Sequence, residues 1–224
     1  MNPAFEERIV TSGHVPFHAV EQYRQLAATL HEAQMDRGLK VVMVTSAVLG
    51  EGKSLTAANL ALTLSESYRR RVLLVDADLR RPILHDVFDV PGSTGLSDGL
   101  HRVQPVPFTT FQLSPTLTLL PAGRPDADPM AGLTSKRMTQ FIAEARARFD
   151  WVIIDTPPVV LMPDAHLLAG MTDTVVVVVG AGSTAFDVVR QAVKTIGRKK
   201  ILGIVLNRAE TDEQEEYYSS DIVR

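Results

Sequence analysis

The sequence predicts an α/β fold in which a mostly parallel central sheet lies between two layers of helices. Short apolar, β-branched runs alternate along the chain with stretches whose apolar residues recur at helical spacing. The chain has 224 residues, 45% of them hydrophobic, which is enough for one well-buried domain. Strands that are joined through helices need right-handed crossovers, and these produce a parallel sheet covered on both faces.

The individual elements follow from the same patterns. Apolar runs predict strands at residues 40–45, 71–78, 117–120, 151–155, 174–180 and 201–207. Helical spacing predicts helices at 19–37, 54–68, 133–149 and 185–196, and Gly38 is placed to end the first of them. Residues 83–129 are rich in proline and glycine, so the arrangement of that stretch stays open.

Composition divides the chain into three parts. Residues 1–18 mix polar residues with proline and glycine without a sustained period, so we expect an irregular N-terminal arm. Residues 19–210 carry the alternating pattern and form the folded domain. Residues 211–224 are acidic and poor in apolar side chains, which predicts a mobile tail.

Charge and cysteine content exclude several classes of function. The net charge is -3, which gives no general attraction to nucleic acid or to an anionic membrane surface. The absence of cysteine excludes disulfides, thiolate metal sites and thiol catalysis. Apolar runs are too short to cross a bilayer and the N-terminus has no signal-peptide core. We therefore expect a cytoplasmic protein that reaches a membrane only through a partner.

The stretch KVVMVTSAVLGEGKSLT at residues 40–56 has the order of a strand, a phosphate-binding loop and a helix. Gly50 and Gly52 permit positive φ angles, so that backbone N–H groups converge on one point at the start of the helix. Lys53 is placed to reach the β and γ phosphates of a bound polyphosphate, and the Ser54 hydroxyl to ligate a Mg²⁺ ion that bridges them. The first glycine of the usual loop pattern is replaced here by Ala47.

Two further strands end in acidic residues. VLLVDAD ends in Asp76 and Asp78, and WVIID ends in Asp155. In a parallel sheet the carboxyl ends of the strands meet at the edge where ligands bind. Ser54, Asp155 and the pair Asp76 and Asp78 are therefore expected to supply oxygen ligands to a Mg²⁺ ion, directly or through water.

These motifs resemble those of the bacterial tyrosine kinases of capsule and exopolysaccharide systems. SAVLGEGKS, LLVDADLR and VIIDTPP match that family's Walker A, A′ and B motifs, and the resemblance covers roughly residues 20–210. It implies a P-loop NTPase-type three-layer fold and an ATP-dependent kinase that phosphorylates tyrosines of its own C-terminal tail. The acceptors expected here are Tyr217 and Tyr218.

The resemblance also assigns roles to residues. Lys53 and Ser54 would bind phosphates and magnesium, and Asp155 would be the Walker B acid. Asp76 and Asp78 would manage metal-bound water and the attacking tyrosine hydroxyl, and either of the two is a candidate for the base. The residues implied for the nucleotide site as a whole are Gly50, Glu51, Gly52, Lys53, Ser54, Leu55, Arg80 and Asn207, the last at the adenine-contacting position.

Two other functions remain open on the same fold. The first is a Min/Par-like ATPase switch without kinase activity; its additional signature lysine falls on Val48 here, which favours the kinase together with Arg80. The second is a nucleotide-holding regulator that has lost turnover, which the intact Lys53 and Asp155 disfavour.

Partners are implied by the resemblance as well. A transmembrane polysaccharide co-polymerase is the expected activator, and it would hold the kinase at the inner face of the membrane. The family's oligomerisation motif begins with Glu21 and Arg24, but its third position is Ala27. A homo-oligomer through this helix is therefore an expectation weakened by the loss of one arginine.

Overall fold

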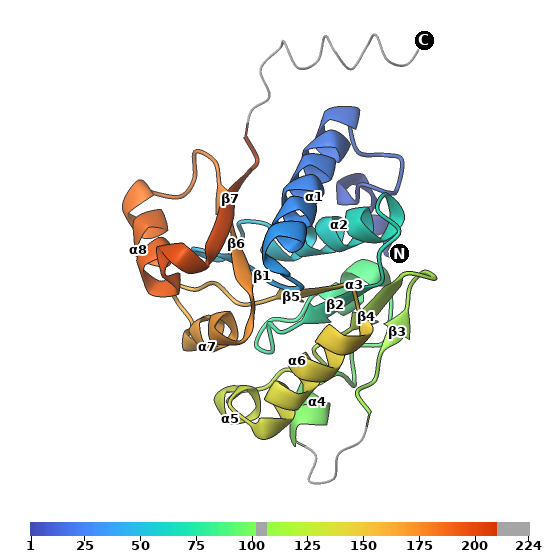
Figure 1. Ribbon diagram of the computed structural model, residues 1–224, viewed down its shortest axis with the longest axis vertical. Coiled ribbons are helices and arrows are strands. Elements are labelled where there is room, and N and C mark those ends of the chain that lie inside the picture. The colour runs from blue at the N-terminus through green and yellow to red at the C-terminus, as the bar shows by residue number, and fades with distance from the viewer. Residues whose placement is uncertain (102–106, 210–224) are drawn as a thin grey trace.

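The computed structural model describes residues 1–101 and 107–209 (Figure 1). Within these residues, seven strands form one sheet. The strands are β1 (Val41–Ser46), β2 (Val72–Asp76), β3 (Phe111–Gln112), β4 (Leu117–Leu120), β5 (Trp151–Asp155), β6 (Thr174–Gly180) and β7 (Ile201–Asn207). The helices are η1 (Pro3–Arg8), α1 (Phe17–Arg37), α2 (Lys53–Glu66), α3 (Leu84–Phe88), α4 (Leu96–His101), α5 (Met130–Leu133), α6 (Lys136–Arg148), α7 (Pro163–Met171), α8 (Phe186–Ile196) and η2 (Arg198–Lys200).

The sheet has the order β3-β4-β2-β5-β1-β6-β7. All neighbouring pairs are parallel except β3 with β4, which is antiparallel. The predicted α/β class with a mostly parallel sheet is therefore confirmed. β1 lies inside the sheet between β5 and β6, so the loop that follows it opens at the carboxyl edge with a strand on either side.

Two hydrophobic cores lie on opposite faces of the sheet. Alternate strand residues such as Val42 and Val44 pack with α1, α2 and α3. Met43 and the other strand residues on the opposite face of the sheet pack with α4 to α8. This alternation follows from the period of two along a strand, and strands buried on both faces read as continuous apolar runs. Figure 1 shows the two helical layers, with α1 and α2 on one face and α6, α7 and α8 on the other.

Several boundaries differ from those predicted, for local reasons. β2 ends at Asp76 instead of Asp78, because the Asp76 carboxylate accepts hydrogen bonds from the backbone amides of Asp78, Ile83 and Leu84 and turns the chain. The helix predicted from 133 begins at Lys136, where the Ser135 hydroxyl accepts a hydrogen bond from the Met138 amide as an N-cap.

The N-terminal arm is more ordered than the expected irregular segment. Pro3–Arg8 forms a 3₁₀ helix, and Ile9 is completely buried against α2 and α3 residues. Asn59 on α2 holds this arm by accepting a hydrogen bond from the Val10 amide at 3.0 Å and donating one to the Arg8 carbonyl at 2.8 Å. The isolated apolar pair at 9–10 is too short to produce a period, which is why the sequence pattern does not reveal it.

No helix in residues 1–101 or 107–209 is long and apolar enough to cross a bilayer. The predicted acidic tail at 211–224, including Tyr217 and Tyr218, lies outside the described residues.

Candidate functional site

The loop between β1 and α2 has the backbone geometry of a phosphate cradle. Gly50 and Gly52 have φ angles of 81° and 91°, a region that strains residues with a Cβ. At Gly52 a Cβ would also lie 2.1 Å from the Asn207 amide nitrogen, so the position excludes a side chain on two grounds. α2 begins directly at Lys53, and its first N–H groups and dipole therefore face the loop.

Lys53 lies at the centre of a cluster of acidic side chains. Its Nζ is 2.9 Å from Asp78 Oδ2 and 3.9 Å from Asp155 Oδ1, and it donates a hydrogen bond to Ser54 Oγ at 3.1 Å. Although β2 ends before Asp78, the turn still brings this carboxylate to the lysine. The structure thus brings together four predicted site residues from three separate strand ends.

Asp76 and Asp155 are neighbours across the sheet. Parallel pairing of β2 with β5 places their Cα atoms in register, and both side chains are completely buried. Asp76 accepts three backbone hydrogen bonds, whereas the charge of Asp155 is stabilised by the nearby Ser54 hydroxyl and Thr156 amide and by Lys53, whose Nζ lies 3.9 Å away. Burying an ionised carboxyl without full compensation is costly, so this pair favours a bound proton or a cation.

The pKa values of the cluster follow from burial and mutual charge. Burial raises the pKa of Asp76 to about 8, with repulsion from Asp155 adding to the effect. Burial raises the pKa of Asp155 to about 6, against the attraction of Lys53. Burial alone would lower the pKa of Lys53, but attraction to Asp155 and Asp78 raises it above the usual value, and the amine stays charged.

The donor set fits a magnesium ion. Asp155 offers the oxygens of a completely buried carboxylate, next to Ser54 at the start of α2. No cluster of three or more His, Cys, Asp or Glu that could enclose a metal lies in residues 1–101 or 107–209. Magnesium is characteristically held by one or two carboxylates together with phosphates and water, which is the arrangement that these residues allow.

Glu51 has a role that its sequence position alone does not reveal. Its carboxylate points into the protein and is buried, accepting hydrogen bonds from the Val48 amide at 2.7 Å, the Gly180 amide at 3.0 Å and the Thr184 hydroxyl at 2.6 Å. The side chain therefore ties the phosphate loop to the turn between β6 and α8. No spacing rule links residue 51 to residues 180 and 184, so only the fold could show this contact.

The end of β7 closes the loop from another side. Asn207 donates a hydrogen bond to the Glu51 carbonyl at 2.8 Å, and the Arg208 guanidinium donates one to the Gly50 carbonyl at 2.8 Å. Asn207 therefore lies against the phosphate loop, and its predicted contact with adenine stays a prediction. Arg208 was not anticipated as part of this site.

Two predicted nucleotide-site residues have other contacts. Arg80 pairs with the buried carboxylate of Asp164 in the first turn of α7, with Nε 2.6 Å from Oδ2, and this hydrogen bond raises the pKa of Arg80. Leu55 is half-buried and packs against the core on the α1 and α2 side. Neither contact indicates that Arg80 or Leu55 binds a nucleotide.

The predicted oligomerisation residues Glu21 and Arg24 form an ion pair with each other on the exposed face of α1.

Comparisons with known proteins identify the family. A family model described as ParA, NUBPL iron-transfer P-loop NTPase, matches residues 38–222. The tyrosine-protein kinase YwqD of Bacillus subtilis is 36% identical over 200 residues, which are 88% of this chain and 84% of that protein. The chain belongs to the bacterial tyrosine kinase family, within the ParA-type P-loop fold.

Solved structures agree with this identification. The kinase domain of the Escherichia coli tyrosine kinase ETK is 29% identical with a TM-score of 0.78, over 87% of this chain and 78% of that one. The Pyrococcus furiosus cell division ATPase MinD is 22% identical with a TM-score of 0.64, over 82% and 78% of the two chains, and shares the fold alone. Membership of the family implies that the loop around Lys53 binds a nucleotide.

Replacing Asp155 with Asn should make the ligand-free protein more stable above pH 6. A carboxyl whose folded-state pKa is raised binds its proton more tightly in the folded than in the unfolded chain, so it lowers the free energy of unfolding as pH rises from about 4 to about 6. The variant lacks this effect, so its free energy of unfolding should exceed that of the wild type by roughly 1–3 kcal/mol at pH 7. Urea unfolding from pH 4 to pH 8 measures it.

Asp150→Asn is the matched control, because Asp150 directly precedes the same strand. Burial alone would raise the pKa of Asp150, but hydrogen bonds from Arg71 lower it below the usual value. This variant should therefore lose stability at neutral pH and approach the wild type as the carboxyl protonates. If Asp155→Asn were less stable than the wild type at pH 7, this would contradict the view that the buried charge of Asp155 destabilises the ligand-free protein.

Replacing Glu51 with Gln should weaken nucleotide binding about tenfold or more, because an amide NH₂ would face the Val48 or Gly180 N–H and leave a buried donor unpaired. Titration with a fluorescent ATP analogue measures the affinity. Glu66→Gln makes the same chemical change at an exposed position at the end of α2 and should leave the affinity within about twofold. Equal affinities for the two variants would exclude a positioning role for Glu51.

Proposed function

We propose that this chain is an ATP-dependent protein tyrosine kinase that phosphorylates Tyr217 and Tyr218 in its own C-terminal tail as part of exopolysaccharide or capsule synthesis. The observation that carries the proposal is the cluster of Lys53 with Asp76, Asp78 and Asp155 behind the phosphate loop of a chain in the tyrosine kinase family. Phosphoryl transfer needs positioning and charge neutralisation, which in this proposal Lys53 would supply together with the cation that the carboxylates would hold.

Lys53 is the residue that we assign to the phosphates. It stays charged because of its acidic neighbours, and its Nζ lies 2.9 Å from Asp78 Oδ2. Gly50 and Gly52 allow backbone N–H groups to surround the same point. Ser54 and Asp155 would hold Mg²⁺, with Asp76 beside them, and the ion would neutralise phosphate charge when bound.

Asp76 is our choice for the proton acceptor. Its pKa is raised to about 8, and a base with a pKa close to the working pH is efficient in proton transfer. Three backbone amides fix the orientation of its carboxylate. Asp78 is less suited because its carboxylate is occupied by the ion pair with Lys53. In this proposal Asp76 removes the proton from the tyrosine hydroxyl while Asp78 orients the lysine.

A transmembrane polysaccharide co-polymerase is the activating partner that we propose. It would recruit the chain to the inner face of the membrane, and its cytoplasmic segment would promote the kinase reaction. Phosphates on Tyr217 and Tyr218 would add negative charge to a tail that is already acidic, and this would weaken contacts with acidic surfaces. These roles follow from the family and are independent of the cluster geometry.

Incubation with Mg²⁺ and ATP should place phosphate on Tyr217 or Tyr218, and peptide mass spectrometry detects it. Lys53→Met should reduce the modification about 100-fold or more, because it removes the phosphate-binding charge. Asp76→Asn should abolish turnover while nucleotide binding persists, whereas Asp78→Asn should mainly raise the KM for ATP.

The double variant Tyr217→Phe, Tyr218→Phe is the control for the site of modification. It should hydrolyse ATP without accumulating phosphotyrosine. ATP hydrolysis with no phosphotyrosine in the wild-type chain, even with a co-polymerase segment added, would instead support the Min/Par-like switch. Phosphate transfer that survives Lys53→Met would exclude the assigned site.

A further inference from the structure

Positive charge is concentrated at the amino edge of the sheet, where the parallel strands begin and which is opposite the phosphate loop. The chain reaches this edge through five segments, each leading from the end of a helix into a parallel strand. Together these segments contain ten of the 23 Lys and Arg residues but only three of the 26 Asp and Glu residues. The segments are residues 35–40, 67–71, 146–150, 171–173 and 197–200, and we call them the amino-edge surface.

The strand register brings the five segments to one level. Val72 pairs with Trp151 and Val41 with Val152, and the other neighbouring strands begin with the same small offset. From β2 to β7 the edge spans four strand spacings, about 19 Å. The cations therefore form one broad surface, and its width fits an extended anionic partner better than a single small anion.

The cations of this surface face solvent, whereas two of its three acids are already compensated. Asp173 accepts hydrogen bonds from Arg146 at 2.6 Å and from the Lys40 and Val41 amides. Asp150 forms an ion pair with Arg71 at 3.2 Å. The exposed cations include Arg37, Arg69, Arg148, Arg198 and Lys199.

The helix dipole does not account for this charge. Cations complement the negative end of a helix dipole only within the last turn, which explains the basic residues at the ends of α1 and α6. α2 has no basic residue in its last turn, and the arginines at 69–71 come after it. The cations at 198–200 likewise come after Gly197, which ends α8. These two triplets therefore need another explanation.

Arg69 is retained at a conformational cost. Its φ of 50° lies in the left-handed region, which glycine adopts without strain and arginine does not. Glycine would fit this turn, yet the chain places an exposed arginine there. A side chain held on a strained backbone points to a function that depends on that side chain.

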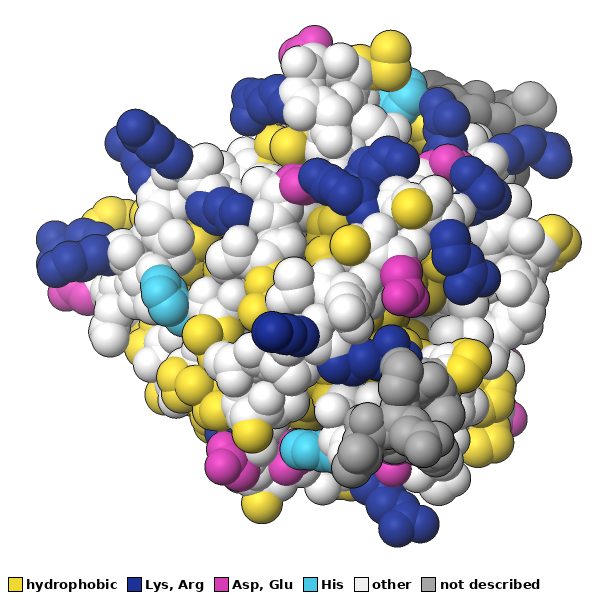
Figure 2. All heavy atoms as spheres, turned by 60° about the horizontal axis from the view of Figure 1, so that its bottom comes forward, with side chains coloured by type: hydrophobic (Ala, Val, Ile, Leu, Met, Phe, Trp, Pro, Cys, Tyr) yellow, Lys and Arg dark blue, Asp and Glu magenta, His cyan; other side chains and the backbone are white. Residues whose placement is uncertain are grey.

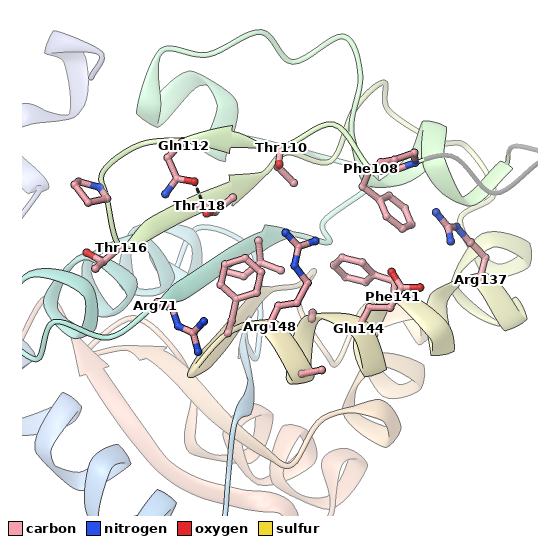
Figure 3. A pocket seen from close by; sticks show the side chains of 16 residues that line it. Arg71, Phe108, Thr110, Gln112, Thr116, Thr118, Arg137, Phe141, Glu144 and Arg148 are labelled. Atoms are coloured by element: carbon pink, nitrogen blue, oxygen red, sulfur yellow. Dashed lines mark hydrogen bonds between the residues drawn. The ribbon is translucent and has the colours of Figure 1, made fainter.

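The positive charge continues from the amino-edge surface onto α6. Figure 2 turns forward the lower part of Figure 1, which includes α5 and α6, and dark blue Lys and Arg side chains outnumber the magenta acidic ones on this face. Arg71 and Arg148 also line a groove of about 1050 Å³ between α6 and the β3–β4 hairpin, with Arg137 farther along α6 (Figure 3). Among the described residues, Glu144 is the one acidic side chain of this groove.

The amino-edge surface also presents an apolar side chain. Met35, in the last turn of α1, is 75% exposed. Beside exposed cations, such a side chain can enter the boundary between lipid headgroups and acyl chains while the cations contact anionic headgroups. Nucleic acid offers phosphates but no comparable apolar layer, so the combination favours a bilayer.

We propose that the amino-edge surface binds the anionic surface of a lipid bilayer. Each Lys or Arg close to such a surface strengthens binding about fivefold. The net charge of -3 hides this property, because it averages a basic edge with an acidic remainder. Since Lys53 lies at the opposite edge of the sheet, the phosphate loop would face away from the lipid. The proposal deepens the membrane recruitment of the proposed function and rests on it for the choice of a membrane.

Flotation of the full-length chain with lipid vesicles tests the proposal. Pure phosphatidylcholine vesicles are compared with vesicles that also contain about 30% phosphatidylglycerol, and the anionic vesicles should bind at least about tenfold more tightly at about 100 mM salt. Binding should weaken about fivefold or more at about 500 mM salt, because exposed charges are screened.

Variants that remove one charge locate the contact. Arg148→Gln should weaken binding to the anionic vesicles about fivefold. Arg124→Gln is the matched control, because it removes an exposed arginine that follows β4 at the carboxyl edge, and it should leave binding within about twofold. Arg69→Gly should also weaken binding about fivefold although glycine fits this turn, and Arg69→Lys should retain it.

The proposal is overturned if the wild-type chain binds both kinds of vesicle equally, or if Arg148→Gln and Arg124→Gln weaken binding equally. Tighter binding to a DNA duplex of about 30 base pairs than to the anionic vesicles, at the same salt, would overturn it in favour of nucleic acid. Should Arg148→Gln fail to fold, Arg69→Gly decides, because weaker binding supports the proposal and unchanged binding contradicts it. Vesicle binding needs neither ATP nor catalysis, so it can succeed or fail independently of the proposed kinase activity.

Discussion

The energetics of this protein centre on carboxylates buried without full compensation at the carboxyl edge of the sheet. Asp76 and Asp155 lie in register on β2 and β5, both completely buried, and Lys53 is the charged neighbour that limits their repulsion. A chain optimised for stability alone would replace such a pair with apolar residues. The cost is understandable if the cluster exists to receive a cation and a phosphate.

The parts around the cluster serve to hold it in place. Glu51 fastens the phosphate loop to the turn after β6, Asn207 closes it from β7, and the Arg80 pair with Asp164 fixes the segment after β2 to α7. Each of these contacts joins segments far apart in the sequence. Site geometry therefore depends on the complete sheet.

Much of the fold was predictable because its strands are buried on both faces and read as continuous apolar runs, as in 174–180. The phosphate loop was predictable because Gly50, Gly52 and Lys53 form a local pattern. Three features could not be predicted, because they depend on residues that meet only in the fold. They are the arrangement of residues 83–129, the 3₁₀ helix of the N-terminal arm and the hydrogen bonds of Glu51. Asp78 shows the intermediate case: its strand ends early, yet a turn still brings it to Lys53.

The most direct test of the central claim is the number of protons released when Mg²⁺ and nucleotide bind. Calorimetry at pH 7.5 in two buffers of different ionisation enthalpy, with Mg²⁺ and ADP premixed, measures it. Because Asp76 holds a proton when its pKa is about 8, binding of the ion should release about one proton per chain. Release of no proton, or uptake of one, would contradict the account of a buried, partly protonated acidic pair.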